Sequence, residues 1–431
     1  MFRRFALLLA ACLIAATVPA MGATIQRLTH QPPTGAWITF QMTDGTVLAQ
    51  GGNESDFWKL TPDNTGSYVN GTWKQVASLP FVPLYFASAV LADGRLVVAG
   101  GEYLNGDFAF TNKSAIYDPL ADKWTDITPD KRLLPFIGDS PAAILPDGRF
   151  VVGEKFKKTM FALDPKTLAW SELASTNKQD FNAEEGWVLM PDGSLLTHDV
   201  KAHPKTERYL PDQGTWVTAG STKVDLRGPQ DCCGECIPYG NGKCYHPPGE
   251  VGPAVLMPDG RVFASGAIPE NESVSHTAIY SPPNARHPKG KWTAGPDFPP
   301  GEDGGDCPIA LLPNGNVLVE VDFGIGNLYE FDGKALTRTA SSVGWGSLML
   351  LPTGEVLING YEVYQPGGTY KAAWQPTISN FPASVTRGST YQISGTQFNG
   401  LSQASGMGDE EETVTNYPLV RITNKSTGHV F

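Results

Sequence analysis

The chain has little cysteine, more acidic than basic side chains and no long apolar run, and each shortage excludes a class of protein. Six cysteines in 431 residues exclude a small disulfide scaffold without a core of its own. Lys and Arg number 32 against 44 Asp and Glu, a formal net charge of −12. Such a chain lacks the basic surface that nucleic acid requires, so we expect no nucleic-acid partner. The Gly-x-Ser-x-Gly, phosphate-loop and His-Glu-x-x-His motifs are absent as well.

The longest apolar stretch lies at the N-terminus and predicts export. Arg3 and Arg4 precede an apolar stretch from Phe5 to Val18, and small residues follow up to Ala23. About 14 apolar residues are too few for a transmembrane span, which needs about 20, whereas this order of segments is that of a signal peptide. We therefore expect residues 1–23 to be a signal peptide and the protein to be secreted, periplasmic or at the cell surface. Lipid attachment at Cys12 is the alternative.

Glycine and proline, by contrast, are plentiful, at 47 and 35 residues, and the glycines mark a repeat. Seven segments, from MTDGTVLAQGG (42–52) to LPTGEVLING (351–360), consist of an apolar strand, a turn ending in glycine and a second apolar strand. The turn glycines are Gly45, Gly94, Gly148, Gly193, Gly260, Gly315 and Gly354. Asp-Gly and Asn-Gly favour two-residue type I′ turns. A hairpin that recurs about every 50 residues predicts a β-propeller with one hairpin per blade.

A second pattern follows most of the hairpins, namely an aromatic residue or leucine seven residues before a tryptophan. We expect these pairs on the third and fourth strands of each blade, with the tryptophans packed between blades as core residues. The pairs are Tyr117 with Trp124, Leu163 with Trp170, and Tyr209 with Trp216.

These patterns predict an all-β protein, a seven-bladed β-propeller over residues 24–374 followed by a second, smaller domain. We expect a strand at Ile25 to Leu28 to complete the seventh blade. The repeats end near Trp374, and residues 375–431 show short alternating strands with Pro and Gly turns. This pattern predicts an immunoglobulin-like sandwich, but such a domain has about 100 residues. We therefore expect a partial, truncated module.

The glycine pairs Gly51-Gly52 and Gly100-Gly101, with the later Tyr-Asp-Pro…Trp segment, resemble the kelch repeat. Together with the signal segment and the run PTISNFPASVTRGSTYQISG (376–395), the chain looks like the galactose oxidase and glyoxal oxidase superfamily. More closely, it resembles bacterial kelch-repeat proteins whose tail is an immunoglobulin-like module of the IPT/TIG or early-set kind. The resemblance covers nearly the whole exported chain, and it specifies fold more than chemistry.

The resemblance implies a copper site made of a cysteine thioether-linked to a tyrosine, an axial tyrosine and two histidines. Tyr85 occupies the position implied for the cysteine, and Glu250-Val251 occupies that of a Tyr-His pair. The dipeptide Tyr245-His246 comes several residues too early. We therefore expect no copper and no other obligatory cofactor, with an oxidoreductase of the galactose oxidase type as an alternative.

The mouth of the propeller channel is the candidate ligand site. Counting nine residues back from each turn glycine aligns the openings of the inner strands, at Ala36, Tyr85, Asp139, Glu184, Val251, Asp306 and Trp345. Carboxylates that converge there would repel one another, and a cation such as Ca²⁺ or a hydroxyl-rich ligand would relieve the repulsion. Aromatic rings would stack on sugars; the alternative is that the carboxylates only cap backbone amides. The candidate ligand-binding residues are Tyr85, Asp139, Glu184, Glu185, Trp187, Glu250, Asp306 and Trp345.

Two other groups are candidates for metals or disulfides. His198, Asp199 and His203 form a weak candidate transition-metal site, with surface residues as the alternative. Export favours disulfides, and we expect Cys307 to pair with one cysteine of the cluster at residues 232–244. The alternative is that this cluster binds zinc. The disulfide candidates are Cys232, Cys233, Cys236, Cys244 and Cys307.

The sequence thus predicts an exported, monomeric, non-catalytic module that binds a glycan or another extracellular ligand, including a protein. The alternatives are the oxidoreductase and a glycan hydrolase or lyase that uses paired carboxylates.

Overall fold

A computed structural model describes residues 22–229, 237–238, 244–246, 249–322, 326–342, 346–386, 388–402, 405–407 and 417–431. Within these ranges the protein consists of β-strands and connecting turns, with one 3₁₀ turn, η1 (Ala372–Trp374). None of the described residues forms a helix with the length and apolar character that crossing a membrane requires.

Each of the seven repeated segments forms a hairpin within a larger antiparallel sheet, and we name each sheet by its turn glycine. The first three sheets, in hydrogen-bonded order, have these strands. The Gly45 sheet has β2 (Thr39–Gln41), β3 (Val47–Gln50), β4 (Phe57–Thr61) and β5 (Thr72–Val76). The Gly94 sheet has β7 (Ala87–Val90), β8 (Leu96–Ala99), β11 (Ser114–Asp118) and β12 (Lys123–Asp126). The Gly148 sheet has β13 (Ala142–Ile144), β14 (Phe150–Gly153), β15 (Met160–Leu163) and β16 (Trp170–Leu173).

The remaining four sheets continue the series. The Gly193 sheet has β17 (Val188–Leu189), β18 (Leu195–His198), β19 (Lys205–Leu210) and β20 (Thr215–Ser221). The Gly260 sheet has β23 (Ala254–Leu256), β24 (Val262–Ser265), β25 (Thr277–Ser281) and β26 (Lys291–Ala294). The Gly315 sheet has β36 (Ser405–Met407), β27 (Pro308–Leu311), β28 (Val317–Val321), β29 (Asn327–Phe331) and β30 (Leu336–Ser341). The Gly354 sheet has β31 (Leu348–Leu350), β32 (Val356–Ile358), β33 (Glu362–Gln365) and β1 (Thr24–Arg27).

Three small sheets accompany these seven in the described part of the chain. They are β6 (Pro83–Leu84) with β9 (Tyr103–Leu104) and β10 (Asp107–Phe108); β21 (Ile237–Pro238) with β22 (Cys244–Tyr245); and β34 (Thr377–Asn380) with β35 (Ser394–Thr396).

The seven repeated turns share one geometry, and it is not the two-residue type I′ turn that the sequence predicts. The Gly94 amide donates to the Leu91 carbonyl (2.9 Å), and the Leu91 amide donates to the Arg95 carbonyl (2.7 Å). Gly94 has a φ of +87°, whereas the φ of Asp93 is negative. This is a three-residue loop, a type I turn followed by a left-handed glycine. Both hydrogen bonds and the left-handed glycine recur at Gly45, Gly148, Gly193, Gly260, Gly315 and Gly354.

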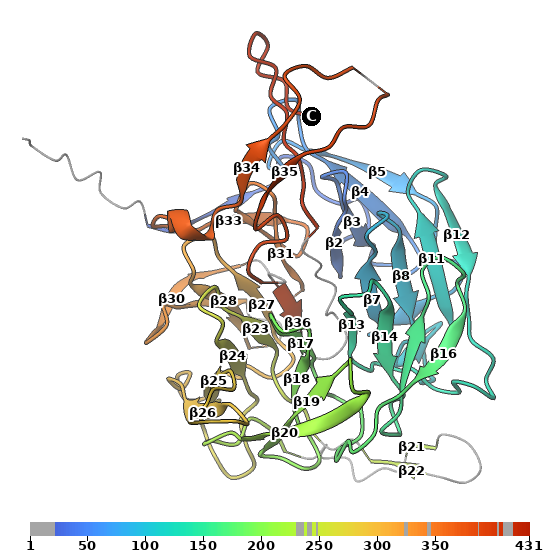
Figure 1. Ribbon diagram of the computed structural model, residues 1–431, viewed down its shortest axis with the longest axis vertical. Coiled ribbons are helices and arrows are strands. Elements are labelled where there is room, and N and C mark those ends of the chain that lie inside the picture. Colours follow the sequence, from blue (N-terminus) through green and yellow to red (C-terminus); the bar gives the residue numbers. More distant parts are fainter. Residues whose placement is uncertain are drawn as a thin grey trace, which may run out of the picture.

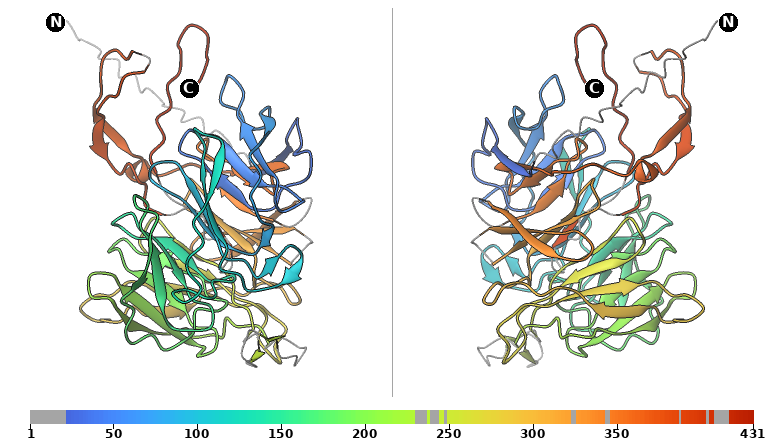
Figure 2. Two further views of the ribbon diagram at one scale, coloured as in Figure 1. Left: turned by 90° about the vertical axis from the view of Figure 1, so that its right-hand side faces the viewer. Right: turned by 90° about the vertical axis from the view of Figure 1, so that its left-hand side faces the viewer.

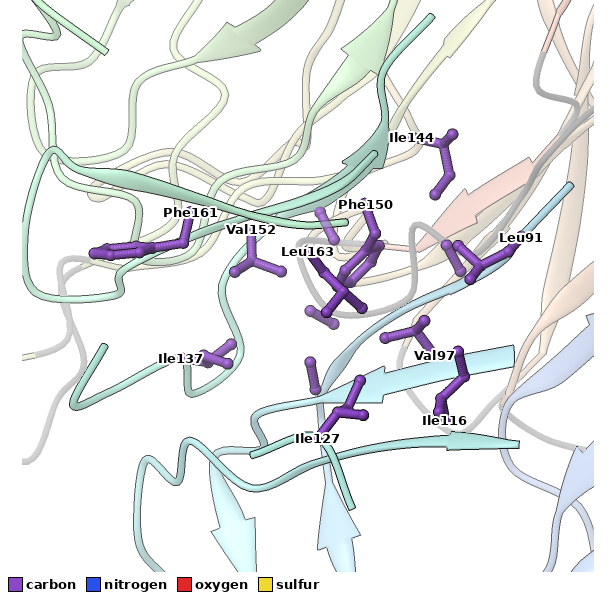
Figure 3. Close-up of a cluster of buried hydrophobic side chains, with 14 of the residues drawn as sticks. Leu91, Val97, Ile116, Ile127, Ile137, Ile144, Phe150, Val152, Phe161 and Leu163 are labelled. Carbon is purple, nitrogen blue, oxygen red and sulfur yellow. The ribbon is translucent and has the colours of Figure 1, made fainter. Parts of the chain in front are cut away.

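The hydrophobic core is divided among the interfaces between consecutive sheets. Figure 3 shows one such cluster, in which Val97 and Ile116 of the Gly94 sheet face Phe150 and Leu163 of the Gly148 sheet. Six further clusters each join two neighbouring sheets, and one of them packs Leu357 of the last sheet against the first. Because the last sheet packs against the first, the sheets form a closed ring (Figure 1). The fold is therefore all-β and propeller-like.

The tryptophans lie between sheets, as the sequence predicts. Trp124 lies opposite Tyr117 in the β11–β12 pair, and its Nε1 donates to the Ala77 carbonyl beyond the preceding sheet (2.8 Å). Trp170 Nε1 likewise donates to the Ile127 carbonyl (2.7 Å). These two indoles thus each add a hydrogen bond to the apolar contact between sheets. Trp216 is buried as well, but its Nε1 has no hydrogen-bond partner among the described residues.

The N-terminal strand closes the ring. β1 pairs antiparallel with β33, with Ile25 opposite Tyr364, which is the strand predicted around Ile25 to Leu28. The last sheet therefore takes its strands from both ends of the ring-forming segment.

The tail does not confirm the predicted immunoglobulin-like sandwich. Its described strands are the β34–β35 pair and β36, which leaves the tail and pairs with β27, Ile309 lying opposite Gly406. Figure 1 shows β36 near the centre of the ring, where it lies against β23 and β31 as well. The β34–β35 pair and the β21–β22 hairpin project at opposite sides of the molecule (Figure 2).

Candidate functional site

Three of the aligned strand-entry residues share a strained backbone. Tyr85, Glu184 and Asp306 have φ values of +52°, +56° and +51°. A left-handed conformation costs a residue with a side chain about 1–3 kcal/mol, and such residues cluster at functional sites. The same conformation therefore turns three side chains from three different sheets at equivalent positions.

Asp139 and Glu184 meet on one lysine beneath the mouth. Lys155, in the loop after β14, is fully buried. Its Nζ contacts Asp139 Oδ1 and lies 2.6 Å from Glu184 Oε1. Lys155 Nζ also lies 5.1 Å from the centre of the Phe110 ring. The single positive charge of the lysine balances one of the two buried carboxylates and leaves the other in excess.

Two half-buried acids, Glu102 and Asp306, complete this cluster. The pKa of Glu102 is raised to about 9, first by burial and then by the charge of Asp139, while Lys155 acts in the opposite direction. Burial, followed by the charge of Glu184, raises the pKa of Asp139 to about 7. The pKa of Asp306 rises to about 7 for the same two reasons. At neutral pH the group therefore holds both protonated and ionised carboxyls, which donate and accept hydrogen bonds. We call Glu102, Asp139, Lys155, Glu184 and Asp306 the mouth cluster.

Residues of the mouth cluster come from four sheets, which locates the cluster on the ring axis. Glu102 follows β8, Asp139 precedes β13, Glu184 precedes β17 and Asp306 precedes β27. Side chains from the second, third, fourth and sixth sheets approach one another only around the centre of a ring. The sequence prediction that acidic residues converge there is consistent with this geometry.

A row of aromatic rings lies beside the mouth cluster. Tyr85 and Tyr103 have ring centres 6.1 Å apart, and Tyr103 is 5.3 Å from Phe108. The row continues through Phe110, at 4.3 Å from Phe108, to Phe156, at 4.9 Å from Phe110. Tyr85, Tyr103 and Phe156 are half-buried and Phe108 is exposed, so the row presents ring surface to solvent.

Two other predicted site residues, Trp187 and Glu185, have partners outside the mouth cluster. Trp187 is buried with its ring 6.0 Å from that of Trp216, so it belongs to the core between the third and fourth sheets and offers no face to a sugar. Glu185 is fully buried and turns to Lys178, at 2.8 Å. Glu250 is half-buried, and Trp345 lies outside the described residues.

The predicted histidine metal site does not form. His198 is buried with Nε2 3.1 Å from the Gly252 carbonyl, and burial lowers its pKa to about 4. His203 Nδ1 instead lies 2.6 Å from Asp225 Oδ2. The Asp199 carboxylate instead lies with those of Asp180 and Glu185, because successive side chains along a strand face opposite sides.

Cys307 corrects the disulfide prediction. Its thiol is free and buried, and its Sγ donates to the Asp303 carbonyl at 3.4 Å. The side chain points into the protein, where burial raises the thiol pKa well above its usual value. Of the other candidates, Cys232, Cys233 and Cys236 lie outside the described residues, as does the side chain of Cys244.

Sequence reasoning missed Glu102, Lys155 and Tyr103. All three lie in the segments that connect the second and third strands of their sheets, and Tyr103 is part of β9 within that segment. In a propeller those loops share a face with the inner-strand openings, so an acid directly after Gly100-Gly101 was the available signal. The nine-residue count covered only the inner strands.

No protein-family model matches the chain, and no curated protein matches it. A solved fungal alcohol oxidase of the AA5 family, in complex with copper, matches 96% of this chain and 92% of its own at 13% identity and a TM-score of 0.57. A streptogramin B lyase matches 79% of this chain and 97% of its own at 11% identity and a TM-score of 0.51. A catalytically inactive virginiamycin B lyase from Staphylococcus aureus, with quinupristin, matches 79% and 98% at 11% identity and a TM-score of 0.50. At these identities the likeness concerns the fold alone, and the chain is similar to β-propeller proteins, including one of galactose oxidase type.

Proposed function

We propose that this protein is an exported, seven-bladed propeller of the kelch kind that binds a glycan at the mouth of its channel. The observation that carries the proposal is the aromatic row beside the mouth cluster. Flat rings stack on the apolar faces of sugars, and carboxyls hydrogen-bond sugar hydroxyls. Sites for small ligands combine such apolar surface with a few convergent polar groups.

The mouth cluster suits hydroxyl groups because it holds both hydrogen-bond donors and acceptors. A protonated carboxyl donates one hydrogen bond, while an ionised carboxylate only accepts. Glu102, with its pKa raised to about 9, is the donor at neutral pH. Asp306 is half-buried and titrates near 7, so it changes from donor to acceptor across the physiological range.

Copper chemistry fits these residues poorly. The AA5 alcohol oxidase structure contains copper, but the mouth cluster of this chain offers carboxylates and a lysine. Imidazole and thiolate suit copper, whereas carboxylates suit Ca²⁺, Mg²⁺ and Mn²⁺. His198 and His203 are engaged elsewhere. We therefore derive no oxidation step for this protein.

A second candidate function is acid–base cleavage of the bound glycan. The specific observation is that the mouth cluster gathers carboxyls from four sheets, among them Glu102 and Asp306, and that burial raises the pKa of both. Paired carboxyls of raised pKa can act as general acid and general base.

A glycan array followed by calorimetry tests the proposal. We expect the wild type to bind one glycan class and Tyr103→Ala to bind it about 5-fold more weakly, because an aromatic contact contributes about 1 kcal/mol. Glu102→Ala should weaken binding by a similar factor at neutral pH or below, because it removes the hydrogen bond that the protonated carboxyl donates, which contributes about 1 kcal/mol. Glu102→Gln should bind like the wild type at this pH, because its amide still donates and accepts.

Tyr370→Ala is the matched control, since Tyr370 is exposed beside Leu312 and Pro313, at the repeated turns. Equal affinity of Tyr103→Ala and wild type, or no glycan bound at millimolar concentration, would contradict the proposal. New reducing ends, or unsaturated ends, in the bound glycan would assign the second function.

A further inference from the structure

A second acidic cluster lies behind the fourth sheet, apart from the aromatic row. Asp180 and Glu185 come from the loop between β16 and β17, and Asp199 directly follows β18. All three are buried, and one carboxylate oxygen of each lies within 4.8 Å of one from each of the others. Glu207 on β19 and Lys178 border the same space, with Lys178 Nζ 3.7 Å from Glu207.

Most of these groups already have partners. The Asp180 carboxylate accepts hydrogen bonds from the backbone amides of Phe181, Lys201 and Ala202, at 2.9, 2.7 and 3.0 Å. Both Glu207 oxygens accept from the Gln179 amide at 3.0 Å. These bonds hold the two carboxylates in place.

Glu185 and Lys178 form a buried ion pair within the cluster. Lys178 Nζ lies 2.9 and 2.8 Å from the two oxygens of Glu185, and 4.5 Å from the centre of the Trp216 ring. This lysine therefore carries one positive charge toward four acidic side chains.

Asp199 is the exception, and it carries the argument. Its side chain is 2% exposed, yet neither Oδ1 nor Oδ2 has a hydrogen-bond partner. A buried carboxylate without a partner costs several kcal/mol. A protonated Asp199 would still need an acceptor for its proton, and neither oxygen has a partner in hydrogen-bond range. The missing partner must therefore be something that accepts electron pairs from oxygen.

We propose that Asp180, Glu185 and Asp199 bind one divalent cation of the calcium class, which locks the loop between the third and fourth sheets to β18. Ca²⁺ binds oxygen ligands at about 2.3–2.6 Å, so two ligands on opposite sides of one ion are about 4.8 Å apart. The spacing of the three carboxylates is within that span. The ion brings two positive charges to four carboxylates and one lysine, and it leaves a single excess negative charge.

The ligand chemistry supports a hard cation over a soft one. The three ligands are all carboxylates, which suit Ca²⁺, Mg²⁺ and Mn²⁺.

The test compares the melting temperature of the chelator-treated full chain with and without Ca²⁺, Mg²⁺ or Mn²⁺. At a calcium concentration about 100 times Kd we expect a rise of about 5 °C, and one ion per chain by equilibrium dialysis. Asp199→Asn should abolish the rise and the bound ion, while its ion-free form melts at or above the ion-free wild type, because the unpaired charge is gone.

Two controls separate this site from others. Asp212→Asn, at an exposed aspartate of the β19–β20 turn, should keep the full calcium response. Asp306→Asn, in the mouth cluster, should also keep it, whatever becomes of glycan binding. A response lost in Asp306→Asn but kept in Asp199→Asn would assign the ion to the mouth cluster and overturn the proposal. No response of the wild type to any of the three ions would overturn it as well.

Discussion

Lys155 is one positive charge among the four acids of the mouth cluster, and its side chain is fully buried. Burying an ion pair gains little stability on balance, because the desolvation of both ions offsets their attraction. Removing only one partner is different, since it leaves a buried charge without compensation. The lysine is therefore a positioning residue that permits acidic side chains to gather at the axis.

Lys155→Met should lower the free energy of unfolding by about 3–5 kcal/mol, measured by urea denaturation at pH 8. The carboxyls of Asp139 and Glu102 already have raised pKa values, and losing the lysine raises them further. A group whose pKa is raised on folding costs stability as pH rises from its unfolded value through its folded value. The loss should therefore be smaller at pH 5 than at pH 8.

The double variant Lys155→Met with Asp139→Asn serves as the control, because it removes one charge of each sign. It should recover part of the stability lost in Lys155→Met. Equal losses at pH 5 and pH 8 would show that packing of the lysine stem, rather than its charge, dominates.

At this scale the sequence predicted part of the site. Asp139, Glu184 and Asp306 follow from a count along equivalent strands, because the repeat fixes where each inner strand begins. Trp187 was wrong because it lies one residue before β17, where the direction of the side chain depends on the preceding loop. Lys155 could not be predicted, since nothing local distinguishes it from the neighbouring Lys157 and Lys158.

The repeated hairpin shows at the scale of elements how a turn can be located but mistyped. Asp-Gly is compatible with a type I′ turn and with a type I turn followed by a left-handed glycine. The extra loop residue decides between them: the Leu91 amide donates to the carbonyl of Arg95, four residues on, while the Leu91 carbonyl accepts from the Gly94 amide. Some of these turns carry an aspartate before the glycine. Its carboxylate then accepts a hydrogen bond from the backbone amide two residues later, as Asp93 Oδ1 does from the Arg95 amide at 3.2 Å.

Two glycine variants separate backbone strain from steric clash. Gly260 has a φ of +85° and open space around an added Cβ, so Gly260→Ala should cost about 1–2 kcal/mol of unfolding free energy. Gly100 has a nearly equal φ of +86°, but its Cβ would lie 2.3 Å from the Gly138 carbonyl. Gly100→Ala should therefore cost more.

The clash in Gly100→Ala should also affect ligand binding, because Gly138 directly precedes Asp139 of the mouth cluster. Gly100→Ala should weaken glycan binding in calorimetry, whereas Gly260→Ala should leave it unchanged. Equal losses of unfolding free energy in the two variants would show that the backbone after β8 can shift to accommodate the added Cβ without a further loss of stability.

For the whole molecule, closure of the ring depends on four residues at its N-terminal end. Without β1, strand β33 would be an exposed edge and Ile25 would leave the core between the last two sheets. Deleting Thr24–Arg27 should lower the free energy of unfolding by at least about 2 kcal/mol, the value of one large apolar side chain.

Urea unfolding followed by tryptophan fluorescence measures this loss. Gln26→Ala, which changes an exposed side chain of the same strand, should unfold at the wild-type midpoint. A deletion variant with that midpoint as well would mean that the ring is held closed by the contact between β2 and β31 alone.

The sequence predicted the ring but not the path of the tail. Seven similar segments determine sheet order and neighbours, and the closing strand follows from its position before the first hairpin. The three residues Ser-Gly-Met of β36 carry no periodic pattern, so their pairing with β27 has no sequence signal. The sandwich was expected from a strand-like sequence pattern, but in the structure this segment forms the two-stranded pair of β34 and β35.

β36 also decides how a ligand can travel. It takes the free edge of β27 and lies against β23 and β31, so backbone occupies the bore between the two faces of the ring. Entry and exit at the mouth then share one route, and a long polymer cannot pass through the ring. Under the proposed function, chain ends and short branches reach the carboxyls, and each encounter ends in release rather than in sliding along the polymer.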